Sequence, residues 1–292
     1  MRVFIIKLFN FVLVFFVIYI LIGFFLFRNN RSVTNELINY QREKIDRISS
    51  LDIVLLGDSS LGNSLDAAIL SENTGSRIEN FALNGYLGYE GNYFLLKRIH
   101  ERHPNIKKVL LMQAVGVSTR NFSIMGVLEN INSFDEFVDL DFKYKYKLIR
   151  GLPSYLNSIK LNQLISRKGF FSNDYIKQKG DLELKTLKIK YKKENINKDK
   201  IFFLSKISNY CKEHKIDLVY ANGPIYQEIY DNSKAYLQNF EAKLDSMNIK
   251  YLKYIDKLNL TELGNTEDHL SPELKSTHTL NFYNANKSLF EL

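Results

Sequence analysis

The fold is decided by the stretch Ile53-Val54-Leu55-Leu56-Gly57-Asp58-Ser59-Ser60-Leu61-Gly62. Its apolar first half is short and is bounded by turn formers, which predicts a buried strand over 52–57. The residues after it predict a helix over about 64–72, with Asn63 or Ser64 near the N-cap. A strand that runs into a helix is where α/β sheets place reactive groups, so Ser59 is a candidate nucleophile. The same letters also fit a plain turn with a helix cap, and they indicate a nucleophile only if a base lies elsewhere in the chain.

Composition limits the class of protein. The chain has 292 residues, of which 45% are hydrophobic, enough for one large domain after an N-terminal segment. Its single cysteine, Cys211, excludes an internal disulfide and lies in a predicted helix, where a buried structural thiol is expected. The motifs imply neither a metal nor any cofactor.

The N-terminus predicts a membrane anchor. Residues 8–27 carry no charge, and twenty residues at helical rise span about 30 Å, the thickness of the hydrocarbon core. No small-residue cleavage site follows, so residues 1–30 are expected to be an uncleaved transmembrane helix rather than a signal peptide. Residues 31–50 are expected to form a stalk helix that leads to the main domain at 51–292. More cations follow the apolar run than precede it, which argues against export, although large domains cross regardless of such a bias.

Beyond the stalk, predicted strands and helices alternate. Strands are predicted at 52–57, 77–83, 107–113, 216–222 and 249–255, and helices at 89–102, 201–215, 235–247 and within 272–290. This alternation predicts an α/β fold, a three-layer sandwich around a mainly parallel central sheet.

Residues 118–198 break the alternation and are expected to be a largely helical insertion, with helical pieces near 153–167 and 181–195. Within it, residues 143–193 carry 14 Lys and Arg against three acids, a net +11, whereas the whole chain has a net charge of +8. We expect a solvated surface or a contact with anionic lipid, and next an anionic polysaccharide groove. Nucleic acid is not expected, because no recognition motif is present.

A candidate base lies far along the chain. His269 lies in the loop 264–272, before the last predicted helix. Imidazole titrates near neutral pH and is suited to take the proton of a serine. A lone loop histidine is more often surface decoration, but this loop is expected to open on the same sheet edge as the Ser59 turn.

With these residues the sequence resembles the SGNH/GDSL hydrolase superfamily over about residues 50–292, outside the insertion. Four places carry the resemblance: Gly57-Asp58-Ser59-Ser60, Asn84-Gly85, Gln113 and Asp268-His269-Leu270. The resemblance implies a flavodoxin-like fold with Ser59 as nucleophile, His269 as base and Asp268 as its orienting acid. It also implies an oxyanion hole formed by Ser59, Gly85 and Gln113. Asp58, Asn84 and Asn222 are candidate substrate-binding residues at the same edge.

Two departures from the family pattern leave alternatives open. Thr266 stands where the family has an aspartate three residues before the histidine. Asp268 or Glu267 could orient His269 if the loop bends, or the site could work as a serine–histidine dyad. Gln113 replaces an asparagine and is one methylene longer. An inactive domain is therefore a second interpretation.

An N-terminal anchor before an SGNH-like domain with a long insertion resembles members that modify envelope polymers. This implies a serine esterase or O-acyltransferase for acyl esters, acetyl above all, of a bacterial cell-envelope polysaccharide. The implied location is the bacterial cytoplasmic membrane, as a single-pass protein with the domain periplasmic or extracellular. A polytopic membrane acyltransferase is the implied partner. The alternative is a catalytically inactive glycan-binding or assembly subunit beside such an acyltransferase.

Overall fold

The computed structural model describes residues 4–11, 14, 33–163 and 182–292. Most of the expected span at 8–27 lies outside these residues, and among the described helices none has the length and apolar character needed to cross a membrane. The chain divides into two compact units: residues 1–36 with 133–169, and residues 37–132 with 170–292. The second unit contains the sheet and all candidate site residues.

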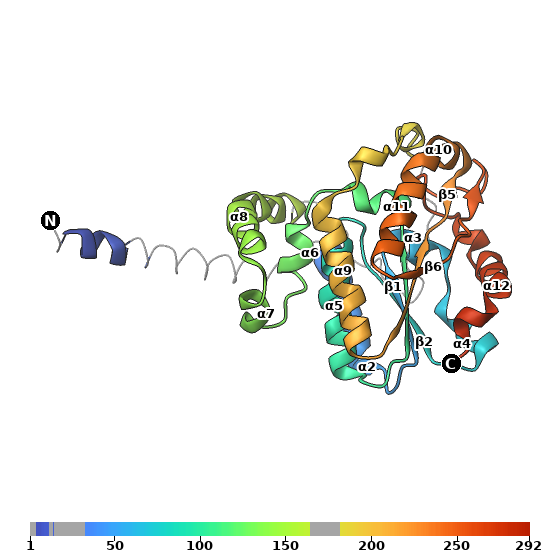
Figure 1. Cartoon of the computed structure of the whole chain (residues 1–292), viewed down its shortest axis with the longest axis horizontal. Coiled ribbons are helices and arrows are strands. Elements are labelled where there is room, and N and C mark those ends of the chain that lie inside the picture. Colours follow the sequence, from blue (N-terminus) through green and yellow to red (C-terminus); the bar gives the residue numbers. More distant parts are fainter. Residues whose placement is uncertain (1–3, 12–13, 15–32, 164–181) are drawn as a thin grey trace. The chain divides into compact units, whose positions relative to one another are not determined.

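The second unit is built on a five-stranded, all-parallel sheet. Its strands are β1 (Ile53–Gly57), β2 (Ile78–Ala82), β3 (Lys108–Gln113), β4 (Asp217–Asn222) and β6 (Lys250–Tyr251), in the order β2-β1-β3-β4-β6 (Figure 1). This is the flavodoxin-like doubly wound order, and it confirms the predicted α/β class. The strand expected at 249–255 is shorter than predicted. The two-residue strands β5 (Ile225–Tyr226) and β7 (Lys257–Leu258) pair with each other in a separate sheet. They are too short to produce a hydrophobic pattern in the sequence.

Helices cover both faces of the sheet. Leu55, Leu110 and Val219 belong to a core cluster that also contains Phe282 and Phe290, from the C-terminal end of the chain. The elements of this layer are α3 (Ser59–Ser64), α4 (Ala67–Thr74) and α12 (Lys275–Ala285). The other layer contains α2 (Val33–Arg47), α5 (Gly88–Arg102), α9 (Lys198–Glu213) and α11 (Lys234–Ser246), with α5 and α9 side by side (Figure 1). Strand side chains alternate between these layers, which explains why the strands are buried almost throughout.

The single helix expected at 64–72 is two helices. α3 begins at Ser59, directly after β1, and Asp58 is its N-cap residue. Asp66 caps α4 and accepts hydrogen bonds from Ala68 N and Ile69 N. Asn63 is not a cap, because its amide donates to Ser59 O at 2.6 Å. The predicted cap at Asn63 or Ser64 is wrong because the strand leads into the helix without a connecting loop.

The segment 31–50 does contain the predicted helix, but from Leu37 onward that helix is packed. Leu37, Ile38 and Ile45 are buried, and the Gln41 amide donates to Ala82 O at 2.8 Å. From Leu37 onward, α2 belongs to a helical layer of the sheet unit.

The insertion between β3 and β4 combines α-helices with 3-10 turns. Its α-helices, ahead of α9, are α6 (Ile124–Leu128), α7 (Phe134–Val138) and α8 (Phe142–Gln163), and its 3-10 turns are η1 (Val115–Thr119), η2 (Thr186–Lys188) and η3 (Lys193–Asn195). The helix expected at 153–167 is the second half of α8, as far as the described residues extend. Where an α-helix is expected at 181–195, the described residues 182–195 form only the 3-10 turns η2 and η3. Leu187, Ile189 and Tyr191 instead pack, from irregular backbone, onto the core cluster around Tyr236.

The C-terminal helix is fastened to the start of the domain. Thr279 Oγ1 accepts a hydrogen bond from Asp66 N at 3.0 Å, and Lys275 Nζ donates to Gly62 O at 2.7 Å. His278 lies between Ser64 O and Asp256, as the structural residue its place in the last helix suggested. At the far end, Lys108 Nζ donates to the carbonyl oxygens of Leu289 and Glu291. These bonds fix the loop before α12 relative to α3.

Cys211, on α9, is the buried thiol that the sequence predicted. Burial raises its pKa to about 12. A thiol with such a pKa stays protonated at neutral pH, so it packs as an apolar side chain.

Candidate active site

The turn after β1 holds Ser59 in a fixed position. Asp58 Oδ1 accepts hydrogen bonds from Ser60 N at 3.0 Å and from Ser60 Oγ at 2.7 Å. Both carboxylate oxygens of Asp58 also lie within 3.2 Å of Ala114 N, which donates to them from the end of β3. One buried carboxylate therefore fastens the nucleophile turn to the neighbouring strand. Ser59 itself is half-buried and is the first residue of α3, where backbone N–H groups have no partner within the helix.

Glycine is required at the end of β1. A Cβ on Gly57 would lie 1.9 Å from the carbonyl oxygen of Met112 in β3. The two strands can pair this closely only because residue 57 has no side chain. Gly223 has a similar role, since its Cβ would lie 2.3 Å from Ser60 Oγ.

The strand register brings the remaining predicted residues to one edge. Gly57 is paired with Ala82 and with Met112, and Gln113 is paired with Asn222. The carboxyl ends of parallel strands meet at the same edge. Gln113 and Asn222 therefore end two of four adjacent strands along that edge, and Asp58-Ser59 and Asn84-Gly85 follow the other two. Asn84 Oδ1 accepts from Tyr86 N at 3.0 Å and so closes its own turn.

Gln113 carries an unsatisfied amide. Its side chain is fully buried, and neither Nε2 nor Oε1 has a hydrogen-bond partner within the described part of the chain. Its backbone oxygen accepts from Gly223 N at 2.8 Å, so the residue is held by its main chain. Leaving a buried polar group unpaired costs about 1–3 kcal/mol, and such groups are concentrated where proteins have a use for them.

The loop that carries His269 is closed on itself. Gly264 N donates to His269 O at 2.7 Å, and Leu263 and Leu270 form an antiparallel bridge. His269 Nδ1 lies 2.7 Å from Asn265 Oδ1. An amide oxygen only accepts, so Nδ1 carries the proton and Nε2 is the nitrogen left to accept one.

Asp268 is placed differently from the expectation that it orients His269. Its Oδ1 lies 3.7 Å from Nε2, and the hydrogen-bond partner of Nδ1 is Asn265 instead. The same oxygen accepts a hydrogen bond from Thr266 Oγ1 at 2.7 Å. The partner at Nδ1 is Asn265, which sequence reasoning missed because Gly264-Asn265 resembles an ordinary turn.

Electrostatics link this loop to the nucleophile turn. Burial raises the pKa of Asp58, the charge of Asp268 raises it further, and Arg120 opposes the shift. The pKa of Glu267 is raised to about 7, again by burial and then by the charge of Asp268. Asp58 and Asp268, the sequence neighbours of Ser59 and His269, thus interact electrostatically although about two hundred residues of chain separate them.

Arg120 and Tyr191 are further residues of this region that the sequence did not point to, since both lie in the insertion, outside any motif. A Cβ on Gly85 would lie 2.4 Å from Arg120 Nη1, so the guanidinium lies directly against the glycine expected in the oxyanion hole. Within the described residues Arg120 has no ion pair within 4.0 Å. The Tyr191 ring lies against Gly116, after β3, and its hydroxyl is 3.5 Å from Glu267 Oε1.

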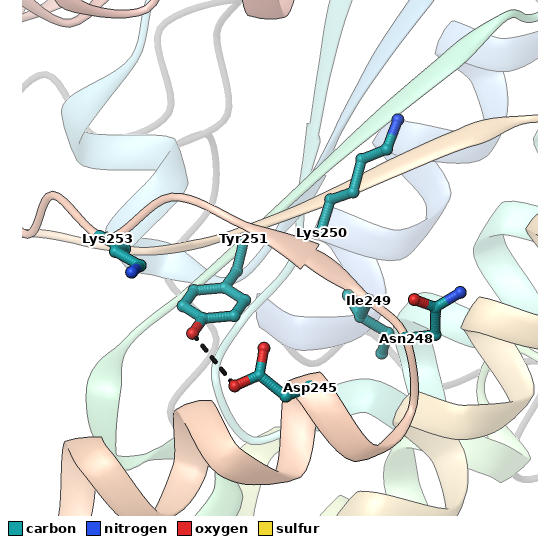
Figure 2. A pocket seen from close by; sticks show the side chains of 6 residues that line it. All are labelled: Asp245, Asn248, Ile249, Lys250, Tyr251 and Lys253. Atoms are coloured by element: carbon teal, nitrogen blue, oxygen red, sulfur yellow. Dashed lines mark hydrogen bonds between the residues drawn. The ribbon is translucent and has the colours of Figure 1, made fainter.

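A surface pocket lies elsewhere. A pocket of about 460 Å³ lies along the edge strand β6. Figure 2 shows the side chains that line it, those of Asp245, Asn248, Ile249, Lys250, Tyr251 and Lys253. Tyr251 points toward Asp245, and their oxygen atoms are 3.5 Å apart. None of the candidate site residues contributes to it. Among the described residues, no group of three His, Cys, Asp or Glu side chains is placed to hold a metal ion.

The fold and site define an α/β protein with a serine on the first sheet turn and a histidine on the last loop. Neither a protein-family profile nor a curated protein sequence matches the chain. Among solved structures, it is similar to a Streptococcus pneumonia protein described provisionally as a platelet activating factor (TM-score 0.44, 10% identity, 88% of this chain and 92% of that one). It is also similar to the esterase EstA from Pseudoalteromonas sp., with a TM-score of 0.38 and 11% identity, over 81% of this chain and 97% of that one. A third similar structure is the acetyl xylan esterase Est2A from Butyrivibrio proteoclasticus, with a TM-score of 0.35 and 7% identity, over 84% of this chain and 66% of that one. At such scores the likeness assigns no activity, so the function is argued from the site.

Proposed function

We propose that the chain is an SGNH-like serine esterase or O-acyltransferase for acyl esters, most simply acetyl esters, of a bacterial cell-envelope polysaccharide. The observation that carries the proposal is the Ser59 turn: Asp58 fastens it to β3 and interacts electrostatically with Asp268, the neighbour of His269. A fixed hydroxyl, an imidazole with one bare nitrogen and a nearby unpaired amide are the parts that acyl transfer requires.

The chemistry follows from these parts. Ser59 Oγ forms a bond to the acyl carbonyl carbon while His269 Nε2 takes the hydroxyl proton. The carbonyl oxygen becomes negative and is stabilised by the backbone N–H groups of Ser59 and Gly85 and by the Gln113 amide. The ester bond then breaks, and His269 returns the proton to the departing sugar oxygen. Water or a second sugar hydroxyl repeats the sequence and frees Ser59, as a hydrolase or a transferase respectively.

The unpaired side-chain amide of Gln113 is a second argument for acyl transfer at this site. A buried side-chain amide without a partner in the described protein is costly, and an oxyanion is a strong acceptor for its N–H groups. The side chain of Gln113 is longer than the asparagine of the family, and under this proposal its amide still donates to the oxyanion.

A second candidate function is an inactive glycan-binding or assembly subunit that partners a polytopic membrane acyltransferase. The observation that favours it is the setting of His269. The group at Nδ1 is the neutral amide of Asn265, and the nearby carboxylate of Asp268 lies on the Nε2 side. A carboxylate at Nδ1 stabilises the imidazolium that forms during catalysis, and an amide supplies only orientation.

A fluorophosphonate probe separates the two functions. The enzyme hypothesis expects the full chain, in detergent, to be labelled covalently, and Ser59→Ala to lose the label while its melting temperature stays unchanged. Ser288→Ala is the matched control: it removes an exposed serine hydroxyl outside the candidate site and should keep the labelling. A correctly folded wild-type chain that takes no label would contradict the enzyme hypothesis and favour the assembly subunit.

Acetylated polysaccharide distinguishes hydrolase from transferase. A hydrolase releases free acetate in the presence of water alone, and a transferase moves the acetyl group to an added glycan acceptor. Both activities should disappear in Ser59→Ala.

We further propose that residues 8–27 anchor the chain in the bacterial cytoplasmic membrane, with the site on the periplasmic or extracellular side, where the polymer lies. A reporter fused after Leu292 tests this orientation. Activity of a reporter that works only in the cytoplasm would contradict it.

A further inference from the structure

The long helix α8 presents a line of apolar side chains to solvent. Phe142, Tyr146 and Ile149 are 82%, 55% and 48% exposed and follow the i, i+4, i+7 spacing of one helix face. Pro153 continues the line and is also exposed. Contiguous exposed apolar groups are uncommon on soluble proteins and mark interaction surfaces.

Cations run beside this line. Lys143, Lys147 and Arg150 have the same spacing, one residue further along, so they occupy the adjoining face. Two of them are held in place by an aromatic ring, since Lys143 Nζ and Lys147 Nζ lie 5.2 and 5.7 Å from the Tyr144 ring centroid. The sequence of α8 contains no Asp or Glu.

The opposite face of α8 is packed. Tyr144, Leu148 and Tyr155 are at most 5% exposed. The helix therefore has one buried face, and its exposed face, called the outward face below, is apolar in one line and basic in the next.

We propose that this outward face of α8 binds the surface of an anionic lipid bilayer. Helices that lie in the lipid interface combine an apolar face of aromatic and aliphatic residues with lysine and arginine alongside. The apolar line enters the headgroup region, and the adjacent cations bind lipid phosphates. A nucleic acid would satisfy the cations but would leave Ile149 and Phe142 in water. The proposal is independent of the activity proposed for Ser59.

Because the chain contains no tryptophan, a single introduced tryptophan reports on one position. The full chain with Phe142→Trp is reconstituted into vesicles of phosphatidylcholine and phosphatidylglycerol that contain brominated lipid. We expect the emission of the new tryptophan to shift to the blue and to be quenched roughly twofold. Tyr254→Trp, at a 58% exposed position in the sheet unit, is the matched control and should stay unquenched.

The electrostatic part is tested with the same readout. Quenching of Phe142→Trp should fall in vesicles of phosphatidylcholine alone, at high salt, and when Lys143, Lys147 and Arg150 are all changed to Glu. The salt and lipid series need no charge variant, so the test stands even if the triple variant folds poorly. Equal quenching in Phe142→Trp and Tyr254→Trp, or an unshifted emission in anionic vesicles, would overturn the proposal.

Discussion

Asp58 and Asn265 each use hydrogen bonds to position one of the two candidate catalytic residues. Asp58 acts on the backbone around Ser59 from a fully buried position, and Asn265 acts on the ring of His269. Of these two, Asp58 was a candidate from the sequence because it belongs to the Gly-Asp-Ser-Ser turn. Asn265 was not, because a side-chain contact across four residues of irregular loop has no periodic pattern.

Replacement of Asn265 tests the orientation of His269. Asn265→Ala removes the acceptor at Nδ1, so the ring can rotate and exchange tautomers, and kcat/KM for an acetyl ester should fall about 10- to 100-fold. Asn265→Asp retains an acceptor and adds charge, so its activity should equal or exceed that of the wild type. Thr266→Val removes only the hydrogen bond to Asp268 and should change kcat/KM by less than about threefold. If Asn265→Ala is fully active and Asp268→Asn is not, Asp268 is the orienting group.

At the scale of elements, the strands and most of the helices could be predicted, because burial on both faces leaves uninterrupted apolar runs such as 53–56 and 109–112. The predictions failed where backbone hydrogen bonding, rather than hydrophobic pattern, sets the structure. The break between α3 and α4 depends on the cap at Asp66. The irregular path of 182–197 depends on single apolar contacts with distant residues such as Tyr236, and those contacts exist only in the folded chain.

The closeness of β1 and β3 at Gly57 gives a prediction for this pair of strands. Gly57→Ala forces a methyl group against the Met112 carbonyl, which is backbone and cannot turn aside. We expect a loss of about 3 kcal/mol in the free energy of unfolding, because an overpacked strand pair must separate. Urea denaturation of the full chain in detergent measures it.

Gly75→Ala is the control for that experiment. Gly75 has a φ of +69° and nothing within 4 Å of its Cβ position, so alanine there costs only the left-handed conformation, about 1 kcal/mol. A Gly57→Ala chain as stable as Gly75→Ala would show that β1 and β3 can move apart freely.

At the scale of the whole molecule, the burial of acids at one sheet edge makes stability depend on pH. The pKa of Glu267 is about 7 in the folded chain against 4.5 for an exposed glutamate. Between these values the folded chain keeps a proton that the unfolded chain has released. The free energy of unfolding therefore falls as pH rises through this window and is level above it. Asp58, whose pKa burial also raises, contributes with the same sign.

Glu267→Gln removes one of these titrating groups while keeping its shape. Its melting temperature relative to the wild type should increase between pH 5 and pH 8, by about 2–4 °C if the linkage amounts to 1 kcal/mol. Thermal melts of both chains across this range measure the difference. A difference that stays constant with pH would mean that Glu267 is ionised throughout in the folded protein.

The bonds made by the last helix have a consequence for the order in which the protein is made. A ribosome delivers β1, β2 and β3 early and in sequence, and these neighbours can pair at once. Lys108 can bind the carbonyl groups of Leu289 and Glu291 only after the ribosome has made those residues, and Asp66 N likewise depends on Thr279. A nascent polypeptide that stops before residue 264 would thus contain the Ser59 turn but would lack both His269 and the hydrogen bonds that join α12 to Gly62 and Asp66.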